Sequence, residues 1–247
     1  MTSLPSWTAS DLPNLTGRTV VITGAGRGLG LITARELARA GARVVLGVRD
    51  TGKARRAVDG LPGIFDVRPL DVSDLTSVRA FADAWTGDID VLINNAGVHG
   101  PHGDPADLTG ADALGVFDVN VFGVVRTITA FLPLLSRSPD PVIINVSSGM
   151  GSLAVTHDPS RIESSVVAPL YTASKAALTM LTTQYAKALK EVRVNAADPG
   201  YTATDLNGHS GPQTVTEGTD AIVRLATEEP GAGSGRFIDR DGPLALS

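Results

Sequence analysis

Cysteine is absent from this sequence of 247 residues. Disulfides, cysteine nucleophiles and cysteine-ligated zinc or iron–sulfur sites are therefore excluded. Basic residues are also few, because 21 Lys and Arg stand against 26 Asp and Glu, a net charge of −5 with the four histidines neutral. This balance argues against nucleic acid as a partner, since such a surface needs an excess of Lys and Arg.

Long apolar runs are missing as well. No run approaches the roughly 20 residues of a membrane-spanning helix, and Met1–Pro5 lacks the apolar core of a signal peptide. Apolar residues still make up 43% of the chain and charged residues 19%, which is enough for a hydrophobic core. We therefore expect a soluble, cytoplasmic, globular protein with no membrane partner.

Short apolar runs alternate along the chain with segments of helical periodicity. The predicted strands are Thr19–Thr23, Arg43–Val48, Phe65–Leu70, Val91–Asn94, Val142–Val146, Val192–Asn195 and Arg236–Ile238. The predicted helices are Gly28–Ala40, Leu75–Trp85, Ala111–Leu135, Tyr171–Lys190 and Val215–Thr227. Most of the strands are continuously apolar, as in a parallel sheet that is covered on both faces. The pattern predicts a Rossmann-type α/β fold, a doubly wound, seven-stranded parallel sheet with helices on both faces.

No repeat or linker divides the chain, so residues 1–247 are predicted to form a single domain. Residues 1–17 are polar and rich in proline, and we expect them to be a surface lead-in to the first strand. His99–Thr109 and Ser152–Pro169 have the composition of surface loops. Long loops at the carboxyl ends of strands are where an α/β fold builds its ligand site.

A glycine-rich turn, Thr23–Gly30 (TGAGRGLG), directly follows the first predicted strand and opens a helix. Glycines allow a tight turn and a close approach of the backbone to a pyrophosphate, and the helix N-terminus offers free N–H groups to that anion. The turn therefore predicts dinucleotide binding, with a merely structural turn as the alternative. The residues concerned are Gly24, Gly26, Arg27, Gly28, Leu29 and Gly30.

The end of the second strand bears on which dinucleotide is bound. An enzyme that selects NAD commonly places an acid there for the ribose hydroxyls. Here Arg49 occupies that position, and Arg27 lies in the glycine-rich turn. Two guanidinium groups near a 2′-phosphate favour NADP(H) over NAD(H), although Asp50 follows at once. The alternative is that both arginines are solvated surface residues.

Tyr171 and Lys175 stand four residues apart at the start of a predicted helix. This spacing places both side chains on one face of the helix. A nearby ammonium stabilises the phenolate and is expected to lower the pKa of Tyr171 toward working pH. The tyrosine could then give a proton to a carbonyl oxygen or take one from an alcohol.

These motifs occur together in the order and rough spacing of the short-chain dehydrogenase/reductase family, which the chain resembles over about residues 18–240. The motifs that carry the resemblance are Thr23–Gly30, Asn94–Gly97 (NNAG), Asn120, Ser147–Ser148, the Tyr171 and Lys175 pair, and Pro199–Gly200. The glycine spacing is similar to that of the single-domain, tyrosine-dependent branch.

The resemblance implies a role for each matching residue. Tyr171 would be the general acid/base, Lys175 would hold the nicotinamide ribose, and Ser148 would polarise the substrate carbonyl. Asn120 would anchor a water that relays protons from Lys175. The further cofactor contacts implied are Asp71 and Val72 at the adenine, Asn95 and Gly97 in the trough, and Pro199, Gly200, Thr202 and Thr204 near the nicotinamide amide.

Several of these residues have a structural alternative. Asn120 could make only backbone hydrogen bonds, and Ser147 could replace Ser148 as the catalytic serine. Asn94 and Asn95 could brace the backbone as well as line the cofactor. Thr202 and Thr204 could cap a turn.

The chain departs from the simplest family members by extra residues between Ser148 and Tyr171, about Thr156–Pro169. Similar insertions occur in carbonyl-reductase-like and retinol-dehydrogenase-like members, many of which use NADPH. The insertion could cap the substrate pocket or cover the helix face through which many members dimerise, so the chain is expected to be a monomer or a homodimer. Only Asp205–Gln213 separates the Pro–Gly turn from the next helix, which suggests an open pocket.

Four histidines, His99, His102, His157 and His209, complete the set of chemically active side chains. His99 and His102 lack an evident third ligand, so no metal site is predicted, and one of them could contact substrate. We expect an NADP(H)-dependent oxidoreductase, a carbonyl reductase or alcohol dehydrogenase, that interconverts a small-molecule ketone or aldehyde with an alcohol. The alternatives are an NAD(H)-dependent alcohol dehydrogenase of the same family and a catalytically silent, cofactor-binding sensor.

Overall fold

The structure is a computed structural model that describes residues 12–246. Most of the predicted lead-in, residues 1–11, lies outside the described residues. Within the rest, Leu15 is buried, and its N–H donates to the carbonyl of Ala40 over 2.8 Å. This part of the lead-in is therefore anchored in the core and is not only a surface segment.

The strands form one parallel sheet in the order β3-β2-β1-β4-β5-β6-β7, which confirms the predicted fold class. Their bounds are β1 (Thr19–Thr23), β2 (Arg43–Val48), β3 (Ile64–Pro69), β4 (Val91–Asn94), β5 (Val142–Val146), β6 (Arg193–Ala197) and β7 (Phe237–Ile238). The strand order reverses between β1 and β4. A crevice at the carboxyl ends of strands on either side of such a reversal is the usual ligand site of an open α/β sheet.

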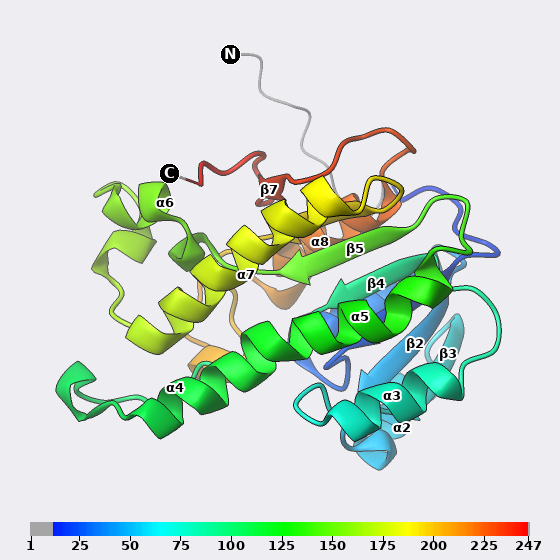
Figure 1. The fold of residues 1–247 in the computed structure, drawn as a ribbon, viewed down its shortest axis with the longest axis horizontal. Coiled ribbons are helices and arrows are strands. Elements are labelled where there is room, and N and C mark those ends of the chain that lie inside the picture. The colour runs from blue at the N-terminus through cyan, green and yellow to red at the C-terminus, as the bar shows by residue number, and fades with distance from the viewer. Residues whose placement is uncertain (1–11, 247) are drawn as a thin grey trace.

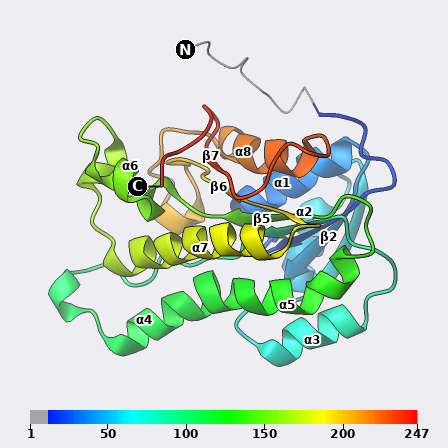
Figure 2. The ribbon, with the colours of Figure 1, turned by 45° about the horizontal axis from the view of Figure 1, so that its top comes forward.

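Helices cover both faces of the sheet, as Figures 1 and 2 show. The apolar side chains of one face pack beneath α1 (Gly28–Arg39), α2 (Thr51–Val58) and α8 (Val215–Thr227). Those of the other face pack beneath α3 (Leu75–Asp83), α5 (Gly123–Leu135) and α7 (Pro169–Ala188). Every strand residue of β4, β5 and β6 is buried, as expected for strands without a polar face.

The sequence interpretation missed the helix α2. Thr51–Val58 is short and polar overall and buries only Ala54 and Val58, so it has few apolar residues from which a helix could be predicted. Asp50 begins the helix, because its carboxylate accepts the N–H of Lys53 over 2.8 Å. An aspartate that caps a helix start was the feature of the sequence from which α2 could have been predicted.

Both predicted surface loops contain short helices. The first loop contains η2 (Pro105–Asp107). The second contains α6 (Leu153–His157) and η5 (Ile162–Ser165), and η4 (Gly149–Gly151) lies directly before it. Figure 1 shows α6 near the start of α7, away from α5. The last residues of the insertion lie over a cavity that is described below, and whether the insertion covers a dimerisation face stays a prediction.

One helix among the described residues, Gly110–Leu135, is long and apolar enough to cross a membrane by length and composition. It comprises α4 (Gly110–Phe117), the π-helical segment η3 (Asp118–Phe122) and α5. Ile128 and Phe131 are fully buried against the sheet, so this helix packs as a core helix. Asp118 and Arg126 interrupt the apolar run, which is why no long run was found in the sequence.

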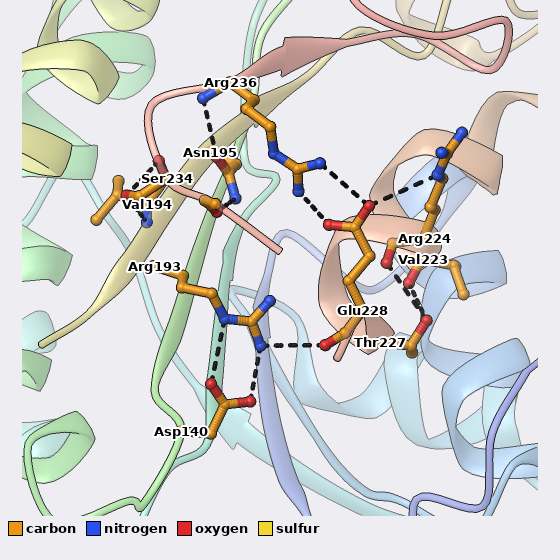
Figure 3. A network of polar contacts seen from close by, with 11 residues as sticks. Asp140, Arg193, Val194, Asn195, Val223, Arg224, Thr227, Glu228, Ser234 and Arg236 are labelled. Carbon is orange, nitrogen blue, oxygen red and sulfur yellow. Dashed lines mark hydrogen bonds and ion pairs between the residues drawn. The ribbon is translucent and has the colours of Figure 1, made fainter. Parts of the chain in front are cut away.

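Charged side chains tie β6, β7 and α8 together at the end of the sheet opposite the crevice (Figure 3). Arg193, the first residue of β6, binds Asp140 through two bonds of 3.1 and 2.7 Å and also donates to the carbonyl of Glu228 over 3.2 Å. The carboxylate of Glu228 pairs with Arg236 and Arg224. Removing one partner of a bidentate arginine–carboxylate pair with little solvent exposure is costly, because it leaves the other charge without compensation.

We expect Arg193→Met to lower the free energy of unfolding by about 2 kcal/mol, because Asp140 loses its best partner in a largely buried position. Chemical denaturation measures this loss. Arg137→Met is the matched control, since Arg137 pairs with Asp88 where both side chains are about half exposed, and it should cost well under 1 kcal/mol. Equal losses of unfolding free energy in the two variants would contradict the greater importance of the Arg193–Asp140 pair.

Candidate active site

The glycine-rich turn has the backbone that close approach to an anion requires. Gly24 and Gly28 adopt φ of +66° and +54°, the left-handed region that favours glycine. A Cβ on Gly24 would lie 2.9 Å from the Cα of Ala96, whereas one on Gly28 would meet only open space. The first glycine therefore serves chain packing, and the second leaves the turn open toward the crevice.

The N-terminus of α1 is free to accept a ligand. Arg27 precedes the helix and makes no side-chain cap, and no acid lies in the first turn. The first N–H groups of α1 thus lack a side-chain acceptor, as in helices that bind phosphate. The residues of this turn fit a dinucleotide pyrophosphate.

Asn95 braces this turn from β4. Its side-chain amide donates to the carbonyl of Thr23 over 2.9 Å and to that of Gly24 over 3.3 Å. A Cβ on Gly30 would lie 2.5 Å from the same amide nitrogen, which explains the glycine there. Asn94 is fully engaged in the core, between Asn145 at 2.9 Å and Thr127 at 2.7 Å. Asn94 is therefore a brace, and Asn95 positions the turn.

The end of β2 presents Arg49 to solvent, and Asp50 is occupied as the cap of α2. Arg27 forms an exposed ion pair with Asp205 at 2.8 Å, and Asp205 also accepts from His209 at 2.8 Å. An ion pair this exposed contributes little, so Arg27 can exchange partners at low cost.

Asp71 and Val72 follow β3 beside Arg49. Burial raises the pKa of Asp71, but hydrogen bonds from Ser73 and the charges of Arg49 and Arg126 outweigh it and hold the pKa below its usual value. The Oγ of Ser73 donates to Asp71 over 2.6 Å. Val72 is buried against Gly123, where a Cβ would lie 2.9 Å from it. Both residues are thus fixed at the carboxyl edge of the sheet.

Tyr171, Ser148 and Lys175 meet at the carboxyl end of β5. Ser148 follows β5, and its side chain acts on the Tyr171 hydroxyl, whose pKa it lowers. Lys175 lies one turn further along α7, with its Nζ 5.6 Å from the centre of the Tyr171 ring and donating to the carbonyl of Val146 over 2.7 Å. Ser147 is buried and bonds Thr179 at 2.7 Å, which removes it from the pocket and favours Ser148 as the reacting serine.

The expected lowering of the Tyr171 pKa does not occur in this arrangement. Burial and the charge of Asp198 raise the pKa of Tyr171 to about 12, against a smaller lowering by Ser148. Burial lowers the pKa of Lys175 to about 8. The Lys175 ammonium is directed at the Val146 carbonyl, so it does not stabilise the phenolate here. That sequence prediction was wrong because it ignored both desolvation and Asp198.

Asn120 lies in the π-helical segment η3, which brings its side chain to the site. Its Oδ1 accepts the N–H of Val98 over 2.8 Å, while its Nδ2 donates to the Val98 carbonyl over 2.8 Å and to Ser174 over 3.0 Å. A Cβ on Gly97 would lie 3.4 Å from Asn120 Oδ1 and 3.7 Å from Lys175 Nζ. Asn120 therefore joins three segments of the site, and a proton relay through it stays a prediction.

The Pro199–Gly200 turn follows β6. Gly200 has a φ of +68°, and a Cβ there would lie 2.3 Å from the side chain of Gln213. Thr202 donates to the Pro199 carbonyl over 2.9 Å, and the backbone N–H of Thr204 donates to Asn207 over 3.1 Å. Both threonines thus shape the chain after the turn, which is the structural alternative raised for them, and a contact with nicotinamide stays a prediction.

A cavity of about 60 Å³ opens beside Tyr171. His99 stacks on the Tyr171 ring at 5.1 Å between centroids, and His102 stacks on His99 at 4.5 Å. Burial and His102 lower the pKa of His99. The cavity is otherwise lined largely by proline and aliphatic residues, among them Val167 and Ala168 from the end of the insertion. The end of the insertion and His99 therefore line the same cavity, and a contact of His99 with substrate stays a prediction.

No group of three metal-ligating side chains occurs in the part of the chain that the structure describes. The sequence interpretation missed two carboxylic acids behind the site, Asp198 and Glu163. Asp198 stands directly before the Pro199–Gly200 turn, and that position was the only signal in the sequence. Glu163 lies in the insertion, whose path could not be predicted.

Fold and site together define a dinucleotide-binding oxidoreductase of the Rossmann type, and the comparisons with known proteins give its family. Residues 18–214 match the family model described as short chain dehydrogenase. The chain belongs to the short-chain dehydrogenase/reductase family, whose members act on alcohols and ketones.

Individual relatives agree with this assignment. A short-chain dehydrogenase of Penicillium roqueforti is 35% identical over 91% of this chain and 95% of its own length. A (+)-neomenthol dehydrogenase of Arabidopsis thaliana is 33% identical over 85% and 92%. The structure of NADPH-bound carbonyl reductase from chicken fatty liver superposes with a TM-score of 0.83 at 26% identity, covering 94% of this chain and 100% of that one.

Proposed function

We propose that the protein is an NADP(H)-dependent carbonyl reductase or alcohol dehydrogenase in which Tyr171 exchanges the proton. The observation that carries this proposal is the meeting of Ser148, Tyr171 and Lys175 at the carboxyl end of β5, with the Lys175 Nζ 5.6 Å from the centre of the Tyr171 ring. A hydroxyl pair of this kind can hold one carbonyl oxygen between two donors.

In the proposed reaction each side chain has one task. Ser148 donates a hydrogen bond to the substrate carbonyl and orients it. Tyr171 gives its proton to the oxygen in reduction and takes it back in oxidation. Lys175 holds the ribose of the cofactor, and Asn120 keeps the segment around Gly97 in place. The bound nicotinamide supplies or accepts the hydride.

The preference for NADP(H) rests on the end of β2. Solved structures of this fold contain NADPH in one case and NADH in another, so the fold alone does not decide. Asp50, the acid that could serve a ribose hydroxyl, already accepts the Lys53 N–H. Arg49 is exposed beside it, and Arg27 is held only by an exposed ion pair. Both guanidinium groups can therefore bind a 2′-phosphate.

The wall of the cavity combines apolar side chains with polar groups. Leu108, Val167 and Leu170 face it together with the His99 and Tyr171 rings. Apolar walls with a few polar groups are typical of pockets that orient a hydrophobic ligand by one or two hydrogen bonds. Cyclic ketones are the first class to screen, because a relative of this chain is named (+)-neomenthol dehydrogenase.

The test is turnover of the whole protein with a panel of cyclic and linear ketones and aldehydes, followed by the nicotinamide absorbance. We expect carbonyl-dependent consumption of NADPH, with a slower reaction from NADH. Turnover restricted to NADH and alcohols would favour the NAD(H)-dependent alternative. Binding of a dinucleotide without turnover of any carbonyl or alcohol would favour a silent sensor and would contradict the proposal.

A further inference from the structure

The segment that follows the Pro–Gly turn, residues 202–213, forms a closed loop that we call the flap. Its two ends are joined by a backbone bridge between Thr202 and Gln213. Inside the flap, Asn207 donates to the Thr202 carbonyl over 2.8 Å and accepts the N–H of Thr204 over 3.1 Å. The flap is therefore held in shape by its own hydrogen bonds, and its exposed side chains have defined positions.

The flap lies against the start of α1. A Cβ on Gly218, in α8, would lie 2.3 Å from Thr202 Oγ1 and 2.9 Å from Leu29 Cδ2, so both side chains reach this glycine. The glycine-rich turn also touches the end of β2, because a Cβ on Gly26 would lie 3.5 Å from Val48 Cγ1. The turn that fits a dinucleotide is thus bordered by the flap and by the end of β2.

An ion pair joins the flap to the glycine-rich turn. Arg27, which directly precedes α1, donates to Asp205 Oδ2 over 2.8 Å, and His209 Nε2 lies 2.8 Å from Asp205 Oδ1. Both carboxylate oxygens of Asp205 therefore have a partner. Hydrogen bonds from His209 and Arg27 lower the pKa of Asp205, so its carboxylate is ionised at neutral pH.

Arg27 stands where two anions can bind it. Its side chain is 65% exposed and that of Asp205 is 43% exposed, so water reaches the ion pair and the guanidinium can leave it at little cost. The other anion is the 2′-phosphate of NADP(H), for which Arg27 is one of the two proposed donors. A guanidinium forms charge-assisted hydrogen bonds with carboxylate and phosphate alike. The two anions therefore compete for the same group.

We propose that Asp205 is a cofactor-selectivity residue: its carboxylate competes with the 2′-phosphate of NADP(H) for the Arg27 guanidinium and so limits the preference for NADP(H) over NAD(H). The inference rests on the proposed function, in which Arg27 contacts that phosphate. It assigns the flap a role in cofactor binding, because the flap supplies the competing carboxylate.

The test is calorimetric titration of the wild type and of Asp205→Asn with NADPH and with NADH. The two cofactors differ only in the 2′-phosphate. We expect Asp205→Asn to bind NADPH about two- to fivefold more tightly than the wild type, the range that the loss of a competing exposed ion pair allows. The affinity for NADH should stay close to that of the wild type.

Two further variants separate competition from a general effect of charge. Asp59→Asn removes the same charge from an exposed position at the end of α2, and it should leave both affinities unchanged. Arg27→Gln removes the guanidinium for which the anions compete. In that background the addition of Asp205→Asn should produce no gain in NADPH affinity, because coupling between two residues is lost when either is removed.

Three results would overturn the inference and leave the proposed function standing. These are an unchanged NADPH affinity in Asp205→Asn, an equal gain for NADPH and NADH, and a gain that persists in the Arg27→Gln background. If neither the wild type nor Asp205→Asn binds a dinucleotide, the proposed function and this inference are both refuted.

Discussion

Tyr171→Phe should lower carbonyl turnover by about 1,000-fold or more, while the dissociation constant of the cofactor stays within about twofold. The first effect follows because the phenol is the only proposed proton donor, and general acid catalysis contributes about 10² to 10⁴-fold. The second follows because phenylalanine keeps the ring that stacks on His99 and leaves the glycine-rich turn untouched. Steady-state kinetics and calorimetric titration measure the two quantities.

Tyr185→Phe is the control for this experiment. Tyr185 lies on the same helix, α7, and packs against the core beneath α5 and α7, so the loss of its hydroxyl should leave turnover close to that of the wild type. Turnover of Tyr171→Phe above about one tenth of the wild type would mean that another group or a water supplies the proton. Tyr171 would then be a binding residue.

Arg49→Ser should weaken NADPH binding by about 10- to 100-fold, because a hydrogen bond between charged partners contributes about 1.5–3 kcal/mol. NADH has no 2′-phosphate, so its affinity should change less than about twofold. Two calorimetric titrations of each protein give the result. The exposed Arg79 of α3 provides the control, since Arg79→Ser removes the same charge without altering the end of β2.

Equal losses of NADPH and NADH affinity in Arg49→Ser would exclude Arg49 from the phosphate site. Arg27 would then be the remaining candidate, because it leaves its ion pair with Asp205 at little cost. A loss confined to NADPH would place the discrimination at the end of β2, where Asp50 is committed to the start of α2.

The sequence predicted the sheet well because most of its strands, such as Val142–Val146, are short, apolar and bounded by clear breaks. The helices that were recognised are longer or richer in apolar residues, and Val215–Thr227 has the predicted bounds. Thr51–Val58 was missed because it buries only two side chains. The short helices of the insertion depend on contacts with distant segments, such as the bond from Ser152 to the Ala245 carbonyl at 2.6 Å.

The candidate site was predictable where residue type and order suffice, as for Tyr171, Lys175 and Ser148. The pKa of Tyr171 was not predictable, because it depends on burial and on Asp198, which lies 27 positions further along the chain. Glu163 could not be placed either, since nothing in the order of residues shows that the insertion folds back to Gly149. Such groups become visible only when segments distant in the chain are brought together.

Titration of the wild-type protein with NADPH and with NADH, each followed by calorimetry, tests the central claim most directly. The account predicts that NADPH binds at least about tenfold more tightly than NADH, as a charge-assisted contact with the 2′-phosphate requires. Tighter binding of NADH would contradict the assignment of Arg49 and Arg27. Binding of neither dinucleotide would contradict the proposed oxidoreductase itself.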